Sequence, residues 1–340
     1  MKKILYIGNQ LAQSHKTVTT IDTLSRLLRD SGIDVMTASS KVNRGLRLLD
    51  MLNHIFRYRK SLDYVLIDTY STQNFYFAFS CGRLCQWLNL KYIPILHGGN
   101  LPKRLKQSPK LSKVLFDHAY VNVAPSQYTK FNFEAYGFQN VICIPNTITL
   151  ENYPYALKDY KCIKLLWVRS FSEIYNPKLA VDILKSLLDQ GLQAELCMVG
   201  PEGDGSLQET KEYAKGLNVD VRFTGKLSKG EWIELSKAYN FFINTTHIDN
   251  MPVSVLEAMA LGLIVVSTNV GGMPYLIHNG VNGVLVEPNS APSFVEMLLE
   301  LIGNPKKAQQ ISQTARNFVT QFDWQHVKNK WIKLFNENKV

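Results

Sequence analysis

The chain has 340 residues, of which 46% are hydrophobic and 19% are charged, and its formal net charge is +10. This length predicts two domains of ordinary size, each able to bury its own core. The N-terminal run MKKILYIG is too short in apolar residues for a signal peptide, and no apolar stretch approaches the ~18 residues of a membrane span. These features exclude an integral membrane protein and predict a soluble cytoplasmic one.

Short β-branched runs alternate with helical patterns along the chain. In the first half we expect strands over 3–7, 63–68, 91–96, 120–124 and 141–144, with helices over 21–31 and 75–88. After a Tyr-rich stretch that ends at Lys161, we expect strands over 163–168, 194–199, 219–223, 241–244 and 264–267. The alternation predicts two parallel sheets with helices between the strands. Apolar residues at helical spacing over 322–335 predict a final helix.

Positive charge is concentrated in the first half of the chain. Residues 1–150 hold 19 Lys and Arg against 8 Asp and Glu, an excess of 11, whereas residues 151–340 hold 19 against 20. This asymmetry indicates an anionic partner such as a membrane surface, a lipid phosphate or a nucleic acid, with a merely soluble basic surface as the alternative. Patterns typical of nucleic-acid binding are missing, which favours the first two partners.

Two basic clusters carry much of this charge. The first, over 44–60, includes apolar residues at helical spacing and predicts a helix that packs on a sheet or faces a membrane; these residues are Leu48, Leu49, Leu52, Ile55 and Phe56. The second, over 103–113, follows His97 and is a candidate site for a lipid-diphosphate acceptor. The five cysteines lack the spacing of a zinc site and indicate buried free thiols in a reducing compartment.

The segment from Asp249 to Gly272 is the most informative part of the chain. It places Asp249 and Glu257 on either side of a predicted helix start, where Pro252 suits the first turn and Gly262 ends the helix. A helix start attracts phosphate through its unpaired N–H groups and positive dipole end. Glu257, one turn in, can accept hydrogen bonds from a ribose. Taken alone, the spacing also fits a capped helix with two solvated acids.

The amino-acid sequence of this segment resembles the E-x7-E region of retaining glycosyltransferases of family 4. The resemblance runs through DNMPVSVLEAMALGLIVVSTNVGG and the NGVNGVLV that follows it. Asp249 stands at the first Glu of that motif and Glu257 at the second. The resemblance implies the GT-B fold, an α/β architecture of two Rossmann-like domains facing a cleft. It implies an acceptor domain over 1–155, a nucleotide-sugar donor domain over 156–321 and a C-terminal helix over 322–340 that crosses back to the first domain.

The resemblance also implies roles for residues of the donor domain. Glu257 would hold the ribose, Asp249 would contact the donor sugar, and Arg169 would contact the diphosphate. The loop around the helix start would add contacts to the donor, through Asn250, Met251, Val253 and Ser254. The loop after the third strand of this half, with Gly225 and Lys226, would bracket the base. The family usually has a Lys five or six residues after the Arg, where this chain has Ile174 and Tyr175. Lys178, or Tyr175 with Asn176, would then replace that Lys.

In the first half, the resemblance makes His97 a reaction-centre residue that contacts the donor sugar. The expected acceptor contacts come from the first loop and from the segment after His97; these residues are Lys16, Gly98, Gly99, Asn100 and Arg104. The chain lacks a D-x-D motif, which fits an enzyme without a metal or cofactor, whose nucleotide-diphosphate sugar is a substrate.

The resemblance implies a hexosyltransferase acting on a saccharide or lipid-linked saccharide in surface polysaccharide assembly, in the cytoplasm or on the inner face of the cell membrane. Two alternatives stay open, a non-catalytic nucleotide-sugar-binding relative and a sugar-nucleotide epimerase of GT-B architecture.

Overall fold

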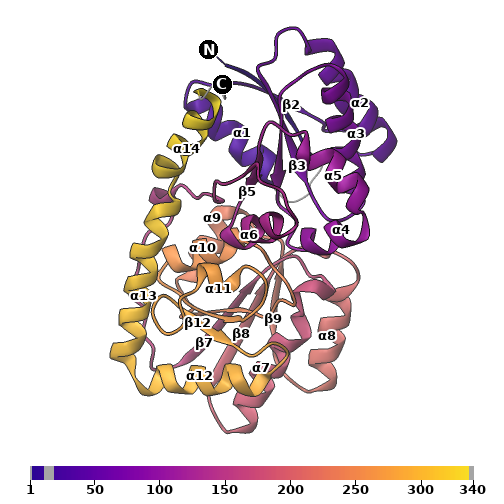
Figure 1. Ribbon diagram of the computed structural model, residues 1–340. Coiled ribbons are helices and arrows are strands. Elements are labelled where there is room, and N and C mark those ends of the chain that lie inside the picture. The colour runs from indigo at the N-terminus through magenta and orange to yellow at the C-terminus, as the bar shows by residue number, and fades with distance from the viewer. Residues whose placement is uncertain (1, 11–18, 337–340) are drawn as a thin grey trace. The chain divides into compact units, whose positions relative to one another are not determined.

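The computed structural model describes residues 2–10 and 19–336 (Figure 1). The chain divides into two compact units, one formed by Met1–Asn146 with Trp324–Val340 and the other by Thr147–Asp323. Within the described residues, each unit contains one six-stranded sheet, and all the paired strands run parallel. The predicted α/β class with two Rossmann-like domains is confirmed.

The sheet of the first unit has the strand order β2-β1-β3-β4-β5-β6. Its strands are β1 (Lys3–Ile7), β2 (Asp34–Ala38), β3 (Tyr64–Thr69), β4 (Tyr92–Leu96), β5 (Asn122–Ala124) and β6 (Val141–Cys143). Alternate side chains of β1 enter two different cores, since Ile4 and Tyr6 pack on one face and Leu5 and Ile7 on the other. Helices cover both faces, as the near-continuous apolar runs of a parallel sheet require.

The helices of the first unit follow the strands in the chain. They are α1 (Thr20–Asp30), α2 (Arg44–Tyr58), α3 (Asn74–Trp87), α4 (Leu101–Gln107), α5 (Pro109–Asp117), α6 (Gln127–Ala135) and α14 (Trp324–Asn336). Although α14 comes last, its apolar face packs into the core of the first sheet through Trp324, Trp331 and Phe335. The indole of Trp324 also lies 3.3 Å from the Ser31 hydroxyl. The predicted return of the C-terminal helix to the first unit is therefore confirmed.

The sheet of the second unit has the order β12-β11-β10-β7-β8-β9. Its strands are β7 (Ile163–Val168), β8 (Ala194–Val199), β9 (Arg222–Gly225), β10 (Phe241–Asn244), β11 (Ile264–Thr268) and β12 (Val284–Val286). Its helices are α7 (Pro177–Asp189), α8 (Ser206–Gly216), α9 (Lys229–Ser236), α10 (Val253–Ala260), α11 (Met273–Leu276), α12 (Ala291–Gly303) and α13 (Pro305–Val319), with short 3-10 turns η2 (Leu150–Asn152), η3 (Glu173–Tyr175) and η4 (Thr320–Phe322). Alternation again divides the strand side chains between two cores, as Trp167 and Leu166 of β7 illustrate.

The two units separate at Asn146/Thr147, whereas the sequence placed a boundary between residues 155 and 156. Residues after Thr147 are tied to the second unit. The backbone N–H of Ile148 bonds to the carbonyl of Phe322 at 3.0 Å, and the hydroxyl of Tyr153 bonds to Glu257 at 2.7 Å. Residues 147–155 of the Tyr-rich stretch, which the predicted boundary assigned to the first domain, are therefore part of the second unit.

The sequence did not predict two of the strands and misplaced a third. β2 and β12 are edge strands that pair on one side only, and only two of the five residues of β2 are buried. β12 spans only three residues. β9 begins three residues later than the predicted 219–223 and includes Gly225, which we expected to follow the strand.

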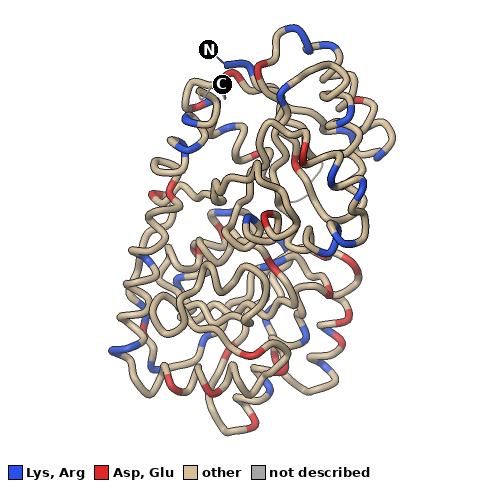
Figure 2. The backbone as a smooth tube through the Cα atoms, in the orientation of Figure 1, with Lys and Arg blue, Asp and Glu red and all other residues tan. Residues whose placement is uncertain are grey.

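Basic residues are frequent on α2, α4 and α5, which carry many of the blue segments in Figure 2. The predicted apolar stripe of α2 does not act as one face. Ile55 is buried, but Leu49 is 63% exposed and Phe56 is 46% exposed. Arg47, by contrast, is buried, and its guanidinium bonds to the carbonyls of Lys41 and Val42.

Two smaller expectations can be compared with the structure. All five cysteines are free, and Cys81, Cys85 and Cys197 are buried as predicted, whereas Cys143 and Cys162 are partly exposed. No helix within residues 2–10 and 19–336 is long and apolar enough to cross a membrane.

Candidate active site

The start of α10 is open to an anion. Pro252 occupies the N-cap position and provides no side-chain cap. Within the described chain, the N–H groups of Val253 and Ser254 make no hydrogen bond, and the Ser254 hydroxyl is buried without a partner. A helix start with unpaired donors and a positive dipole end binds phosphate or carboxylate. The start of α10, where the sequence predicted a phosphate site, therefore has hydrogen-bond donors that are available to an anion.

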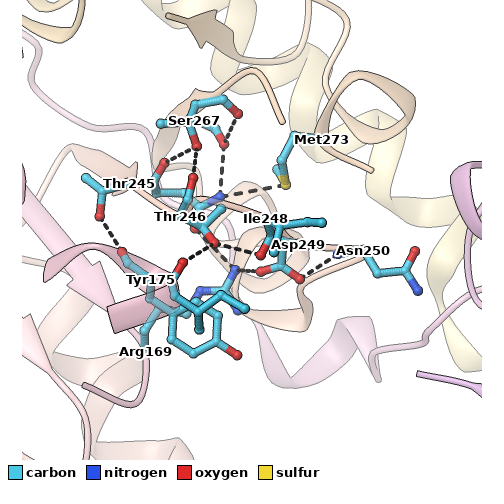
Figure 3. Close-up of polar contacts among 12 residues, drawn as sticks. Arg169, Tyr175, Thr245, Thr246, Ile248, Asp249, Asn250, Ser267 and Met273 are labelled. Atoms are coloured by element: carbon cyan, nitrogen blue, oxygen red, sulfur yellow. Dashed lines mark hydrogen bonds and ion pairs between the residues drawn. The ribbon is translucent and has the colours of Figure 1, made fainter. Parts of the chain in front are cut away.

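Arg169 follows β7 directly and turns toward the loop that precedes α10 (Figure 3). Its Nη2 donates to Oδ2 of Asp249 at 2.5 Å and to Oδ1 of Asn244 at 3.2 Å. The guanidinium also lies over the ring of Tyr175, 4.9 Å from its centroid. Nε of Arg169 is buried and has no hydrogen bond within the described residues. The side chain is thus held at one end while an N–H donor remains available.

Asp249 is bound more tightly into the protein than the sequence indicated. Besides the ion pair with Arg169, its Oδ1 accepts a hydrogen bond from the backbone N–H of Asn250 at 2.8 Å, and its carbonyl accepts one from Gly272 at 2.9 Å. A Cβ atom at Gly272 would lie 1.8 Å from the carbonyl oxygen of Asn250, so only glycine allows this close approach. The structure brings the predicted sugar contact and the predicted diphosphate contact together as one ion pair.

Glu257 lies one turn inside α10 and is 3% exposed. Its Oε1 accepts a hydrogen bond from the Tyr153 hydroxyl at 2.7 Å and forms an ion pair with Nζ of Lys229. Burial, followed by the Glu257 charge, raises the pKa of Tyr153, so the phenol stays protonated and donates. The sequence identified Glu257 but not its two partners, which are separated from it by 104 and 28 residues. Only tertiary structure brings them together.

The loop predicted to bracket the base has its own backbone geometry. Gly225 ends β9 with a φ of +70°, and its carbonyl accepts a hydrogen bond from Gly200 at 2.9 Å. Lys226 follows with an exposed side chain. Both residues therefore lie at the carboxyl end of the second sheet, as do Arg169 and the Asp249 loop, which is where parallel sheets bind ligands.

Lys178, a candidate replacement for the lysine that the family pattern expects, does not reach this site. Its Nζ pairs with Glu209 at 2.9 Å on the surface. The segment before Lys178 is bound to the residues that follow β10, because the carbonyl of Tyr175 accepts a hydrogen bond from the Thr245 hydroxyl at 2.8 Å. The residue beside Arg169 is thus Tyr175 and not a lysine.

In the first unit, His97 follows β4 and forms a buried pair with Asp68, which the sequence analysis overlooked. Nε2 of His97 lies 2.8 Å from Oδ1 of Asp68, and the same oxygen accepts a hydrogen bond from the Tyr6 hydroxyl at 2.8 Å. The Asp68 side chain is 1% exposed. The sequence could have indicated this pair, because Asp68 ends a predicted strand. β3 and β4 are adjacent, so their carboxyl ends meet at one edge of the sheet.

The residues predicted to contact an acceptor differ in their surroundings. Lys16 lies outside the described residues. Gly98 is required by packing, since a Cβ there would lie 2.7 Å from the backbone nitrogen of Ser71. Gly99 and Asn100 are partly exposed before α4. Arg104 is engaged within the protein, with Nε and Nη2 donating to the Ser71 carbonyl at 2.8 and 2.6 Å.

Comparison with known proteins agrees with this architecture. Residues 156–318, most of the second unit, match the family model of glycosyl transferases group 1. An uncharacterized glycosyltransferase of Methanocaldococcus jannaschii is 26% identical over 302 residues, which cover 82% of this chain and 76% of the relative.

Solved structures resemble the whole chain. Sucrose-phosphate synthase from Thermosynechococcus elongatus has a TM-score of 0.83 at 14% identity, covering 98% of both chains. Anabaena HepE in complex with UDP-glucose has a TM-score of 0.78 at 17% identity, covering 98% of this chain and 99% of that one. The fold is that of the GT-B glycosyltransferases.

Proposed function

We propose that the protein is a retaining glycosyltransferase that moves a hexosyl group from a nucleotide sugar to a saccharide or lipid-linked saccharide acceptor. The observation that carries this proposal is the start of α10, where unpaired N–H groups and the Ser254 hydroxyl lie on the same short segment as Glu257. Unpaired N–H donors at a helix start suit a diphosphate, and a carboxylate can accept hydrogen bonds from the hydroxyls of a ribose. HepE, a structural neighbour, is described in complex with UDP-glucose, which supports a nucleotide sugar as the ligand.

The proposed roles follow from this arrangement. Arg169 and the N–H groups of Val253 and Ser254 bind the diphosphate, Glu257 accepts hydrogen bonds from the ribose, and Asp249 contacts the sugar. Nη2 of Arg169 remains paired with Asp249, so Nε of Arg169 can donate a hydrogen bond to a phosphate oxygen. Ribose binding to Glu257 competes with Lys229 for the carboxylate.

In the proposed reaction, the bond between the anomeric carbon and the diphosphate breaks while an acceptor hydroxyl attacks the same face of the sugar. The hydroxyl proton passes to the leaving phosphate, so the reaction needs no separate base. Negative charge develops on the leaving diphosphate, and fixed donors aimed at that charge lower the barrier. Arg169 and the dipole of α10 supply positive potential at this point, so we propose that the reaction is independent of metal. The role of His97 as a sugar contact, which the resemblance implies, stays a prediction.

The acceptor is proposed to be presented at an anionic membrane surface in surface polysaccharide assembly, on the inner face of the cell membrane. The support lies on α2, where Leu46, Leu49 and Phe56 are 58%, 63% and 46% exposed. These positions recur at helical spacing. The exposed cation Arg57 lies in the last turn of the same helix, and the exposed Lys60 lies just after its end. Exposed apolar side chains beside cations are typical of a helix that lies on an anionic bilayer.

A non-catalytic nucleotide-sugar-binding protein is the second candidate, because in the described part of the chain the residue packed on the Arg169 guanidinium is Tyr175 and not a lysine. One experiment separates the two. Thermal shift and calorimetry with UDP-, GDP-, ADP- and dTDP-sugars, in EDTA, should identify one donor, and that donor should release its nucleoside diphosphate when acceptors are supplied. Binding without release across acceptors would favour the second candidate, and no binding of any donor would refute the proposal.

A matched pair of variants makes the binding experiment specific to the site. Replacement of Glu257 by Ala should raise the donor Kd roughly 10- to 150-fold, the value of one hydrogen-bonded charged contact. Replacement of Glu209, which pairs with Lys178 on the surface, should leave the Kd unchanged. Equal affinity of wild type and E257A would remove Glu257 from the ribose site.

A further inference from the structure

We propose that Tyr175 belongs to the diphosphate site, where its ring holds the guanidinium of Arg169 and its hydroxyl donates a hydrogen bond to a phosphate oxygen. This inference rests on the proposed function, because it requires a nucleoside diphosphate at the start of α10. It assigns a neutral phenol to the place beside Arg169 where a second cation was expected.

The contact between the two side chains is well formed. The Arg169 guanidinium carbon lies 4.9 Å from the centroid of the Tyr175 ring, within the range of a cation–π interaction. Figure 3 shows the ring against the guanidinium, while the carboxylate of Asp249 meets one end of it. The face and one edge of the cation are therefore fixed by the protein. A guanidinium held in this way loses little freedom when it binds a phosphate.

The backbone around Tyr175 is fixed to the loop that leads to Asp249. Thr245 donates through its hydroxyl to the Tyr175 carbonyl at 2.8 Å. Thr246 donates in the same manner to the Ile174 carbonyl at 3.1 Å, and the backbone N–H of His247 donates to that carbonyl at 2.9 Å. Three hydrogen bonds thus fix the backbone that carries the ring. Such support is typical of a residue that binds a ligand with defined geometry.

The hydroxyl of Tyr175 is available. No group in the described part of the chain forms a hydrogen bond with it. Burial raises the pKa of Tyr175, Arg169 lowers it and Asp249 raises it, and the net result is a raised pKa. The phenol therefore stays protonated at neutral pH, and its hydroxyl can donate a hydrogen bond to an anion. Figure 3 draws no hydrogen bond to this hydroxyl.

Neither Ile174 nor Lys178, the two described residues near Tyr175 in the chain that were considered for this role, provides a cation in its place. Ile174 is 38% exposed and apolar, and Lys178 is paired with Glu209. A phosphate bound next to Arg169 would therefore receive one charged donor from Arg169 and one neutral donor from Tyr175. This division of labour distinguishes the site from one that binds phosphate with two cations.

The test compares the affinities of UDP and uridine for wild type and for variants, measured by calorimetry. Y175F keeps the ring and loses the hydroxyl, so its Kd for UDP should rise roughly 10-fold or more, as for a hydrogen bond to a charged group, while its Kd for uridine should not change. Y175L should lose a further ~2- to 5-fold for UDP, because the cation–π contact is lost. Y175K replaces the donor and should recover UDP affinity relative to Y175L.

The control is Y213F, which removes a phenol hydroxyl that donates to Asp182 at 2.7 Å elsewhere in the same unit. It should bind both ligands as the wild type does. If Y175F binds UDP as tightly as wild type, or loses UDP and uridine affinity equally, the inference is wrong while the proposed function stands. If wild type fails to bind UDP and every other nucleoside diphosphate, both are wrong.

Discussion

Replacement of Tyr153 by Phe tests whether the buried carboxylate of Glu257 depends on its phenol partner. The Tyr153 hydroxyl donates to Oε1 of Glu257 at 2.7 Å, and Glu257 is 3% exposed. Without the hydroxyl, the carboxylate keeps only Lys229 as a partner among the described residues, and the Lys229 side chain is 57% exposed and screened by water. A hydrogen bond to a charged group contributes about 1.5–3 kcal/mol to stability. For a unit of this size, that loss lowers the Tm by roughly 3–12 °C.

A double-mutant cycle isolates the charge contribution. In E257Q the phenol can still donate to a neutral amide oxygen, a bond worth about 0.5–1.5 kcal/mol. The same Tyr153→Phe change should then lower the Tm by only ~1–6 °C. The control is Y155F, since the hydroxyl of Tyr155 lies 3.3 Å from the uncharged hydroxyl of Ser312. The decrease in Tm caused by Y155F should match the decrease that Tyr153→Phe causes in the E257Q background.

The assay is thermal unfolding followed by scanning calorimetry, which resolves the second unit from the first if they unfold separately. An equal decrease in Tm for Tyr153→Phe with and without the Glu257 charge would refute the reasoning. It would mean that Tyr153 packs near the carboxylate without stabilising its charge.

Three other outcomes are expected. D249A should reduce the transfer rate more than UDP affinity, and equal transfer rates in variant and wild type would remove Asp249 from the mechanism. L49E/F56E should abolish sedimentation with phosphatidylglycerol vesicles while L188E, on the second unit, does not; unchanged binding would exclude α2 as the membrane surface. Burial, followed by Lys237, lowers the pKa of Lys158 to about 8, so the unfolded chain binds a proton that the folded one does not between that pH and the ordinary value of 10.5. The Tm of wild type relative to K158M should therefore rise as the pH increases from 8 to 10.5, and a constant difference would contradict the shift.

The sequence predicted the fold well because burial on both faces of a parallel strand leaves a strong apolar run. β7, β8 and β10 have the predicted bounds for this reason. The two edge strands that were not predicted differ in their reason. β2 has only two buried residues of five, and β12 is apolar but only three residues long.

The candidate site was predictable only where its residues are close in the chain. The segment from Asp249 to Glu257 could be identified because a loop and a helix start determine its geometry. The ion pair of Arg169 with Asp249 joins residues 80 apart, and Tyr153 approaches Glu257 from the stretch that we had placed in the other domain. Asp68 escaped notice because its partner His97 follows a different strand, 29 residues further along the chain.

The most direct test of the account is a crystal structure of the protein grown with UDP. We expect the diphosphate within hydrogen-bonding distance of the N–H groups of Val253 and Ser254 and of Arg169. We also expect the ribose hydroxyls on Glu257, with Lys229 displaced from that carboxylate. A nucleotide bound elsewhere, with the Lys229–Glu257 pair intact and the start of α10 filled only by water, would contradict the central claim.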